Sequence, residues 1–418
     1  MEKFIIRGGA PLCGTVSVSG AKNAALPCLA ACLLTDEPVT LCRIPPLSDI
    51  FAMCDILSGL GCRISRPFAD EFCIDASHLT ACAVPYELAG RLRGSFLVLG
   101  PLLARHKKVS IAMPGGCAIG ARPIDLHLKG FIAMGATVQN TNGCIEASCR
   151  QLHGATIYLD FPSVGATENI MSAAVLAQGE TIIENAAAEP EIVDLANFLC
   201  RMGARITGAG TDTITIRGVE RLHGARHTII PDRIEAGTWL AAAVATGGDV
   251  TVTNIIPDYV KPMTAKLSEM NIPLTIGEDF IRTKPVSSFK AVDVKTLPYP
   301  GFPTDMQSQL SALLCLSDGI SMITETIFEN RFMHAGELCR MGASIKIAGR
   351  NAVIEGSKSL SGAKVKASDL RAGAALVIAA LAAKGDTEIS DIYHIDRGYV
   401  ALDAKLRTLG ASIKREPE

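Results

Sequence analysis

Residues 202–206 read MGARI, and this short stretch decides the fold because it recurs along the chain. Related stretches stand about 70 residues apart. They are LGCRI at 60–64, MGATV at 134–138, MNIPL at 270–274, MGASI at 341–345 and LGASI at 409–413. The second residue of each suits the left-handed position that follows a helix, and the last residue opens a strand. The sequence therefore predicts six similar modules.

A second pattern recurs at the same spacing and supports the repeat. In each module an Ala/Leu-rich helix is followed by a strand rich in β-branched residues. The expected strands are VTLCRI at 39–44, VSIAM at 109–113, TIIEN at 181–185, VTVTN at 250–254, SMITET at 321–326 and TEISD at 387–391. Each module is thus an α/β (or α+β) unit, longer than an ankyrin or tetratricopeptide repeat. Six modules could form one ring or two lobes of three. Two lobes fit ordinary domain sizes better, with a cleft between them as the expected ligand site.

Composition excludes several classes of protein. The chain has 418 residues, of which 48% are apolar and 20% charged, so a disordered chain is excluded. A net charge of −2 and an aromatic content of 5% give no support for binding nucleic acid or anionic membranes. No apolar stretch reaches the ~18 residues of a membrane span, and the first residues do not resemble a signal peptide. With 14 cysteines and no C-x-x-C pair, we predict a cytoplasmic protein in a reducing compartment.

Charged residues mark the starts of the Ala-rich helices. Asp232, Asp305 and Asp369 are expected N-caps, because a carboxylate accepts hydrogen bonds from the first free amides of a helix. Cations at the same end are disfavoured by the helix dipole. Four of them occupy matching positions of the repeat: Lys22, Arg93, Arg233 and Arg371. Since helix N-termini bind anions, they predict an anion site. The alternative is pairing with neighbouring carboxylates, which we prefer for Arg233 with Asp232 or Glu235.

A glycine-rich loop at 114–123, PGGCAIGARP, holds a cysteine that does not suit a core position. Cys117 stands among glycines and near Arg122, a setting typical of thiols with tuned reactivity, although a structural turn cysteine is the alternative. The loop lacks the G-K-[ST] of a P-loop. No metal-ligand spacing and no G-x-S-x-G motif are visible, so we expect neither a metal ion nor a hydrolase triad.

Ten segments together resemble the enolpyruvyl transferases over essentially the whole chain. They are SGAKNAALP (19–27), GPLLAR (100–105), PGGCAIGARPIDLH (114–127), SVGATENIM (163–171), EPEIVDLANFL (189–199), PDRIEAGT (231–238), FPTDMQSQ (302–309), TETIFENRFMH (324–334), SDLRAGA (368–374) and IYHIDRGY (392–399). Within that family the chain resembles the branch that uses UDP-N-acetylglucosamine. The shikimate-pathway sister enzyme does not resemble it at the cysteine loop or in the last segment.

The resemblance implies a fold and a reaction. The fold is an inside-out α/β barrel of two lobes with three repeats each, one at 22–229 with the cysteine loop and one at 1–21 plus 230–418. The reaction moves the enolpyruvyl group of phosphoenolpyruvate to the 3-hydroxyl of UDP-N-acetylglucosamine and releases phosphate. It proceeds by addition and elimination through a tetrahedral ketal, as the first committed step of peptidoglycan synthesis. It needs no cofactor and no metal. A non-catalytic paralogue that binds the nucleotide sugar and the shikimate-pathway enzyme are the alternatives.

The same resemblance implies roles for individual residues. Cys117 would protonate C3 of phosphoenolpyruvate and would be alkylated by the epoxide fosfomycin, and Asp305 would take the proton of the sugar hydroxyl. The cations expected on phosphoenolpyruvate are Lys22, Arg122, Arg331, Arg371 and Arg397, with Lys22 and Arg397 also counted as catalytic. The residues expected on the nucleotide sugar are Asn23, Arg93, Arg122, Pro123, Ile124, Asp125, Leu126, Ser163, Val164, Gly165, Asp305 and Ile327. The expected partners are these small molecules, with no nucleic acid and no membrane.

Overall fold

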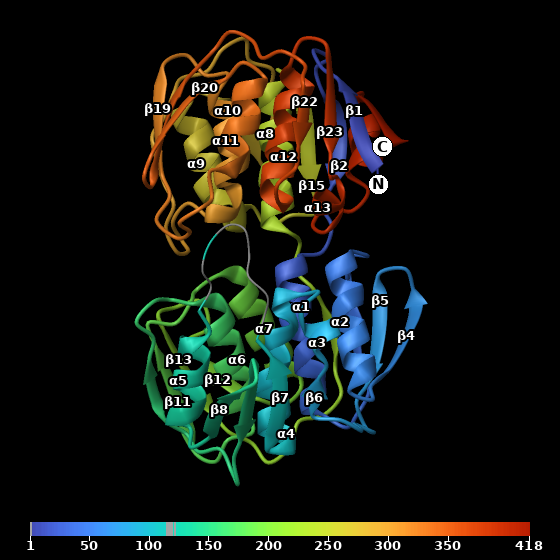
Figure 1. Cartoon of the computed structure of the whole chain (residues 1–418), viewed down its shortest axis with the longest axis vertical. Helices are drawn as coiled ribbons and strands as arrows, with labels where there is room; N and C mark the ends of the chain where they lie inside the picture. Colours follow the sequence, from blue (N-terminus) through green and yellow to red (C-terminus); the bar gives the residue numbers. More distant parts are fainter. Residues whose placement is uncertain (1, 114–119, 121–122) are drawn as a thin grey trace. The chain divides into compact units, whose positions relative to one another are not determined.

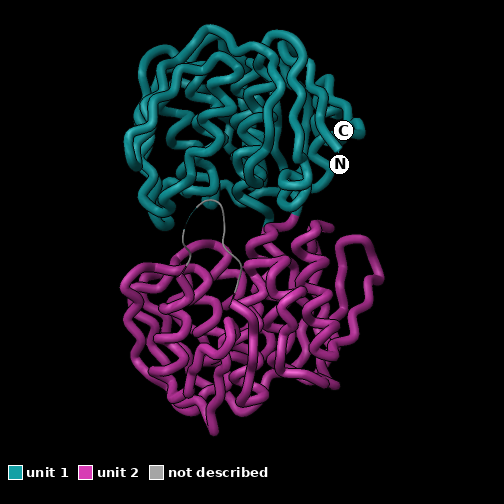
Figure 2. The backbone as a smooth tube through the Cα atoms, viewed as in Figure 1, with its two compact units in different colours: residues 1–19, 117–121, 231–418 teal, residues 20–116, 122–230 magenta. Residues whose placement is uncertain are grey.

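The computed structural model describes residues 2–113, 120 and 123–418, and these residues divide into two compact units (Figure 2). Leaving the segment 114–122 aside, unit 1 comprises 2–19 with 231–418, and unit 2 comprises 20–113 with 123–230. Each unit has its own sheets and its own helices, and each is described by itself below.

The described residues form six four-stranded sheets that share one topology. In every sheet the first two strands in spatial order are parallel and the next two join them in antiparallel fashion. In unit 2 the orders are β14-β3-β5-β4, β6-β7-β9-β8 and β10-β11-β13-β12. In unit 1 they are β2-β15-β17-β16, β18-β19-β21-β20 and β22-β23-β1-β24. This confirms the six α/β modules, although the sheets are separate and do not close into one barrel.

The strands have these bounds. In unit 2 they are β3 (Val39–Cys42), β4 (Arg63–Phe68), β5 (Glu71–Asp75), β6 (Ala83–Val84), β7 (Lys108–Ala112), β8 (Thr137–Thr141), β9 (Cys144–Ser148), β10 (Thr156–Tyr158), β11 (Glu180–Glu184), β12 (Arg205–Thr207), β13 (Thr213–Arg217) and β14 (Arg226–Thr228). In unit 1 they are β1 (Glu2–Arg7), β2 (Cys13–Ser17), β15 (Asp249–Thr253), β16 (Leu274–Ile276), β17 (Phe280–Thr283), β18 (Val294–Lys295), β19 (Ile320–Thr324), β20 (Ser344–Ala348), β21 (Asn351–Glu355), β22 (Lys364–Lys366), β23 (Asp386–Ser390) and β24 (Ser412–Pro417).

Both sequence patterns correspond to fixed places in these sheets. The β-branched stretches form the second strand of each sheet, namely β3, β7, β11, β15, β19 and β23. The MGARI-type stretches lead into the outermost antiparallel strand. Their second residue has a positive φ, for example 102° at Gly203 and 65° at Asn271, as expected after a helix. The period of the sequence is therefore the period of the fold.

Three central helices fill the interior of each unit. In unit 2 they are α1 (Lys22–Ala31), the 3-10 helix η2 (Arg93–Val98) continued by α4 (Leu99–His106), and α6 (Val164–Ala174). In unit 1 they are α8 (Arg233–Ala245), η4 (Thr304–Met306) continued by α10 (Gln307–Leu314), and α12 (Leu370–Ala382). Helices α8, α10 and α12 contact one another, and each also packs on its own sheet (Figure 1). Most residues of these helices are buried, which explains the many Ala and Leu residues in their sequences.

A second helix in each module packs outside the central one. These helices are α2 (Ser48–Gly59), α5 (Asp125–Ala133), α7 (Pro190–Arg201), α9 (Lys261–Glu269), α11 (Met333–Arg340) and α14 (Leu402–Thr408). The remaining short helices are η1 (Cys32–Leu34), α3 (Tyr86–Ala89), η3 (Pro257–Val260) and α13 (Tyr393–Asp396). Among the helices that the structure describes, none has the length and apolar character to span a bilayer.

Two modules exchange their first strands. In sequence β2 precedes α1, yet it pairs in parallel with β15 of unit 1, with Val16 opposite Val252. Likewise β14 precedes α8, yet it pairs with β3 of unit 2, with His227 opposite Leu41. The chain therefore passes from one unit to the other directly before the helices that begin at Lys22 and Arg233.

Candidate functional site

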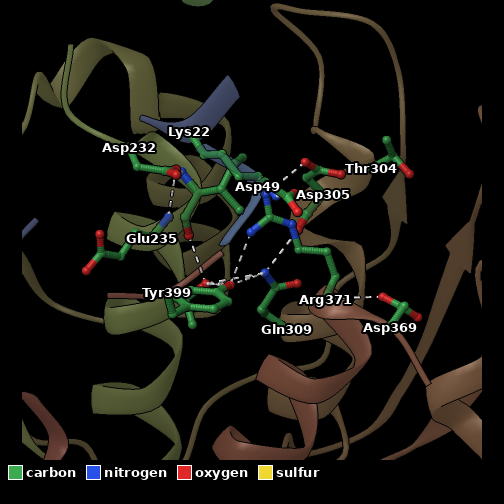
Figure 3. A network of polar contacts seen from close by, with 12 residues as sticks. Lys22, Asp49, Asp232, Glu235, Thr304, Asp305, Gln309, Asp369, Arg371 and Tyr399 are labelled. Carbon is green, nitrogen blue, oxygen red and sulfur yellow. Dashed lines mark hydrogen bonds and ion pairs between the residues drawn. The ribbon is translucent and has the colours of Figure 1, made fainter. Parts of the chain in front are cut away.

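An aspartate between two buried arginines forms a charged cluster close to helix starts of unit 1. Arg331 Nη2 donates to Asp305 Oδ1 at 2.6 Å, and Arg371 Nη2 donates to Asp305 Oδ2 at 3.0 Å. The carboxylate side chain is 28% exposed, whereas the two arginine side chains are 4% and 5% exposed. Figure 3 shows the Arg371 guanidinium between Asp305 and Tyr399. One accessible anion thus faces two nearly inaccessible cations.

Electrostatics keep the Asp305 carboxylate ionised. Burial by itself would raise the pKa of Asp305, but the charges and hydrogen bonds of Arg371 and Arg331 hold that pKa well below its usual range. At neutral pH the group therefore accepts hydrogen bonds and carries a negative charge. A carboxylate with so low a pKa is a weak base for as long as both guanidiniums contact it.

The structure corrects the interpretation of Asp305 as a helix cap. Asp232 and Asp369 are N-caps as expected, the first accepting from the amides of residues 234 and 235 and the second from those of residues 371 and 372. Asp305 instead lies inside η4 and makes no side-chain cap. The physical reason is competition, because two guanidiniums offer charge-assisted hydrogen bonds that are stronger than those of neutral amides.

A buried carboxylate shapes the turn that contains Ile327. Glu325 is 1% exposed and accepts from the amides of Ile327 and Phe328 at 2.8 and 3.2 Å. It also accepts from the hydroxyls of Thr296 at 2.9 Å and Thr304 at 2.8 Å. Since Thr304 directly precedes Asp305, Glu325 links the Ile327 turn to the start of η4.

The helix starts of unit 2 include a second buried ion pair. Lys22, the first residue of α1, is 8% exposed, and its Nζ donates to Asp49 Oδ2 of α2 at 2.9 Å. Lys22 is therefore paired with a carboxylate, and so is Arg371, which contacts Asp305. Pairing with carboxylates was the alternative to an anion site that the sequence left open for these cations. The neighbouring Asn23 is exposed.

Three other helix starts of unit 2 meet around a neutral histidine. His127 of α5 is buried, and burial together with the charge of Arg93 lowers the pKa of His127 to about 4. The imidazole is therefore neutral at pH 7 and accepts at Nδ1 from Asn169 Nδ2 of α6 at 3.0 Å. A Cβ atom on Gly165 would lie 3.2 Å from His127 Cε1. Any other residue at this position would therefore require a small shift of the His127 ring.

The remaining predicted residues lie on the same or neighbouring elements. Ser163 caps α6 by accepting from the amide of Ala166, with Val164 and Gly165 in the first turn. Pro123 is exposed, Ile124 occupies the N-cap position of α5 without a side-chain hydrogen bond, and Asp125 and Leu126 begin that helix. Arg397 is half-buried at the end of α13, where its charge contributes to lowering the pKa of His394 after burial, the main cause. Cys117 and Arg122 lie outside the described residues.

Within the described part of the chain, one group of side chains could hold a metal ion. Cys28, Asp194 and His227 are buried in unit 2, and their donor atoms lie within 4.8 Å of one another. His227 Nε2 and Asp194 Oδ1 are 3.0 Å apart and form a hydrogen bond. None of the three was predicted as a site residue. The three residues are far apart in sequence, so a search for metal-ligand spacing does not find them.

The chain is similar to known proteins in sequence and in fold. The family model described as EPSP synthase (3-phosphoshikimate 1-carboxyvinyltransferase) matches residues 6–406. A protein of Carboxydothermus hydrogenoformans named UDP-N-acetylglucosamine 1-carboxyvinyltransferase 2 is 58% identical over 418 residues, with 99% of both chains covered. The chain belongs to the UDP-N-acetylglucosamine 1-carboxyvinyltransferase family. A second member, from Caldanaerobacter subterraneus, is 57% identical over 416 residues and covers 99% of both chains.

Solved structures agree with this family. The enolpyruvyl transferase NikO from Streptomyces tendae superimposes with a TM-score of 0.90 at 28% identity, covering 99% of both chains. An EPSP synthase from Acinetobacter baumannii has a TM-score of 0.79 at 18% identity and covers all of both chains. The second likeness shows the shared fold of the enolpyruvyl transferases.

Sequence reasoning missed several residues that organise these clusters. Asp49, Glu325, Gln309 and Tyr399 were not predicted, although each contacts a predicted residue or its immediate neighbour. Glu325 and Tyr399 do lie within the segments TETIFENRFMH and IYHIDRGY. Position in those segments was therefore an available signal, but the individual contacts depend on tertiary packing.

Proposed function

We propose that this protein transfers the enolpyruvyl group of phosphoenolpyruvate to the 3-hydroxyl of UDP-N-acetylglucosamine and releases phosphate, for peptidoglycan synthesis. The observation that carries the proposal is the 58% identity over the whole chain to a protein named for this reaction. The cluster of Asp305, Arg331 and Arg371 supports it, because it offers two buried cations beside one accessible carboxylate.

The cations would bind the anionic substrate. Phosphoenolpyruvate carries a phosphate and a carboxylate, and arginine binds both groups bidentately. Arg331 and Arg371 already face an anion, Asp305, so an incoming anion competes with that carboxylate for them. We assign the remaining cations of the site to the same substrate on the family pattern. They are Lys22, Arg122 and Arg397.

Competition for the two arginines would also activate the base. While both guanidiniums contact Asp305, they keep its pKa well below the usual range and make it a weak base. When they turn toward phosphoenolpyruvate, their stabilisation of the ionised carboxylate weakens and the pKa of Asp305 rises. Asp305 would then accept the proton of the sugar hydroxyl as that oxygen attacks C2, while Cys117 protonates C3. In the elimination step a proton leaves C3 and phosphate departs.

The nucleotide sugar would bind mainly at the helix starts of unit 2. Free amides at the beginning of α5 and α6 suit a diphosphate, and the small Gly165 permits close approach of the backbone. The residues assigned to it are Asn23, Arg93, Pro123, Ile124, Asp125, Leu126, Ser163, Val164, Gly165 and Ile327. We further propose that the two units act as the two predicted lobes, 22–229 and 1–21 with 230–418.

Phosphate release tests the acceptor. We expect purified protein to release phosphate from phosphoenolpyruvate when UDP-N-acetylglucosamine is added, and not when shikimate 3-phosphate is added. A colorimetric phosphate assay with each acceptor alone and with neither measures this. Release driven by shikimate 3-phosphate would assign the chain to the sister activity, and release with neither acceptor would indicate simple hydrolysis.

Fosfomycin tests the role of Cys117. We expect this epoxide to inactivate the protein and to add one adduct, located at Cys117 by peptide mass spectrometry. The physical reason is that nearby cations favour ionisation of a thiol to the reactive thiolate, whereas burial raises the pKa values of the Cys28 and Cys315 thiols. Cys117→Ser should retain no adduct. Full activity after treatment, or an adduct on another cysteine, would contradict the assignment.

A further inference from the structure

The Tyr399 hydroxyl lies buried where the three central helices of unit 1 begin. Its oxygen is 2.9 Å from Thr238 Oγ1 of α8, 3.3 Å from Gln309 Nε2 of α10 and 3.4 Å from Arg371 Nη1 of α12. The central carbon of the Arg371 guanidinium also lies 5.9 Å from the centre of the Tyr399 ring. One side chain that is 2% exposed therefore contacts all three helices (Figure 3).

The direction of each hydrogen bond around Tyr399 can be assigned. Thr238 donates its hydroxyl proton to the carbonyl of residue 234 at 2.8 Å, so its oxygen is left to accept. Tyr399 therefore donates to Thr238, and its own oxygen accepts from Arg371 and from Gln309, whose Nε2 lies 3.3 Å from both the Tyr399 and the Thr238 oxygens. A phenol oxygen can accept two such bonds. The Tyr399 hydroxyl thus makes one hydrogen bond as donor and two as acceptor, and the Arg371 guanidinium is one of its two donors.

Gln309 connects the same hydroxyl to the backbone of Asp305. Its Nε2 donates to the Asp305 carbonyl oxygen at 2.9 Å, which fixes the orientation of the amide, because the amide oxygen could not face a carbonyl. Arg371 uses Nη1 for Tyr399 and Nη2 for the Asp305 carboxylate. Tyr399 therefore contacts both Gln309, which donates to the Asp305 carbonyl oxygen, and Arg371, which donates to the Asp305 carboxylate.

We propose that Tyr399 is a positioning residue whose hydroxyl holds Arg371 in the orientation that serves the anionic substrate. This inference rests on the proposed function, in which Arg371 binds phosphoenolpyruvate. Arginine has several rotatable bonds, and a planar guanidinium binds an anion bidentately only when its plane is fixed. If Tyr399 acted by packing alone, its ring would suffice and phenylalanine would replace it without loss.

Tyr399→Phe removes the hydroxyl and keeps the ring. We expect the KM for phosphoenolpyruvate to rise about tenfold, since a hydrogen bond to a charged group is lost, while the KM for UDP-N-acetylglucosamine changes less than twofold. Calorimetric titration with inorganic phosphate should show a similar loss of affinity. A merely structural role would lower the unfolding temperature without separating the two KM values.

Two further variants serve as controls. Tyr393→Phe removes a hydroxyl from the same segment, but Tyr393 is 51% exposed, so both KM values should stay within twofold. Thr238→Val removes the acceptor of the Tyr399 proton. It should shift the KM for phosphoenolpyruvate in the same direction as Tyr399→Phe but by less, because Arg371 keeps its contact with the phenol.

The outcomes separate this inference from the proposed function. Equal changes in both KM values, or unchanged phosphate affinity in Tyr399→Phe, would overturn the positioning role. If the wild type released no phosphate with UDP-N-acetylglucosamine while Tyr399→Phe still bound inorganic phosphate about tenfold more weakly, the proposed reaction would fail and the positioning role would stand. A selective rise in the KM for phosphoenolpyruvate supports both.

Discussion

Asp305→Asn should release phosphate about 10²–10⁴ times more slowly than the wild type, the usual contribution of a general base. The same variant should bind inorganic phosphate more tightly. Asparagine is neutral, so Arg331 and Arg371 lose the carboxylate that competes with an incoming anion. Steady-state phosphate release and calorimetric titration measure the two effects. Their opposite signs distinguish a lost base from general damage, which would weaken both activity and binding.

The stability of Asp305→Asn should depend on phosphate. Without an anion, two guanidiniums that are 4% and 5% exposed lose the carboxylate that they contact, so the unfolding temperature falls. Added phosphate should restore part of it, because a ligand bound only to the folded state stabilises that state. Asp318→Asn is the matched control, since Asp318 is exposed beyond the far end of α10. Activity of Asp305→Asn within threefold of the wild type would refute the base.

The same carboxylate gives stability a defined dependence on pH. The pKa of Asp305 in the folded protein lies below the unfolded value of about 3.9, so the unfolded chain binds this proton more tightly. The resulting stabilisation is complete above the unfolded pKa and is lost as the pH falls through the folded pKa. The difference in stability between wild type and Asp305→Asn should therefore be largest at neutral pH and shrink in acid.

Among the variants discussed, Glu325→Ala should lower the free energy of unfolding the most, by about 3 kcal/mol or more. The change leaves two half-buried amides and two hydroxyls without this acceptor, and each such group costs about 1–3 kcal/mol when water does not replace the acceptor. The amides belong to Ile327 and Phe328, and the hydroxyls belong to Thr296 and Thr304. Chemical denaturation measures the free energy of unfolding. Activity should fall as well, because Thr304 directly precedes Asp305.

Glu325→Gln provides the matched comparison. Three of the four donors meet the same carboxylate oxygen, Oε1, which the glutamine oxygen can replace. The fourth, Thr304, meets Oε2, and its hydroxyl can rotate to accept from the glutamine amide. We therefore expect a loss of less than about 1 kcal/mol. Equal losses in the alanine and glutamine variants would show that the negative charge, and not the acceptor geometry, is what matters.

Much of the fold could be predicted from sequence because short sequence signals recur about every 70 residues, once in each structural module. A residue with positive φ must end each outer helix, and glycine or asparagine marks that place, as at Gly203 and Asn271. The exchange of β2 and β14 could not be predicted from pairing rules. Sequence neighbours usually pack together, but these strands pair with partners more than 180 residues away in sequence.

The candidate site was predicted less completely, for a related reason. Asp305 and Arg371 were visible as charges at helix starts, and the family resemblance added Arg331. That Asp305 binds both arginines and does not cap its helix depends on tertiary contacts across 26 and 66 residues. Glu325 lies in a family segment, but the sequence does not show its contacts, because its four donors are brought together only in the folded chain.

The exchanged strands also determine the order in which the protein can fold during synthesis. All strands of the three sheets of unit 2 lie between residues 39 and 228, so these sheets have all their strands once residue 230 has left the ribosome. Unit 1 must wait, because β1 pairs with β24 near the other end of the chain, with Phe4 opposite Arg415. Until β15 has been made β2 lacks its partner, and β1 lacks both of its partners until β23 and β24 have been made. Unpaired strands of this kind are segments that chaperones protect from aggregation.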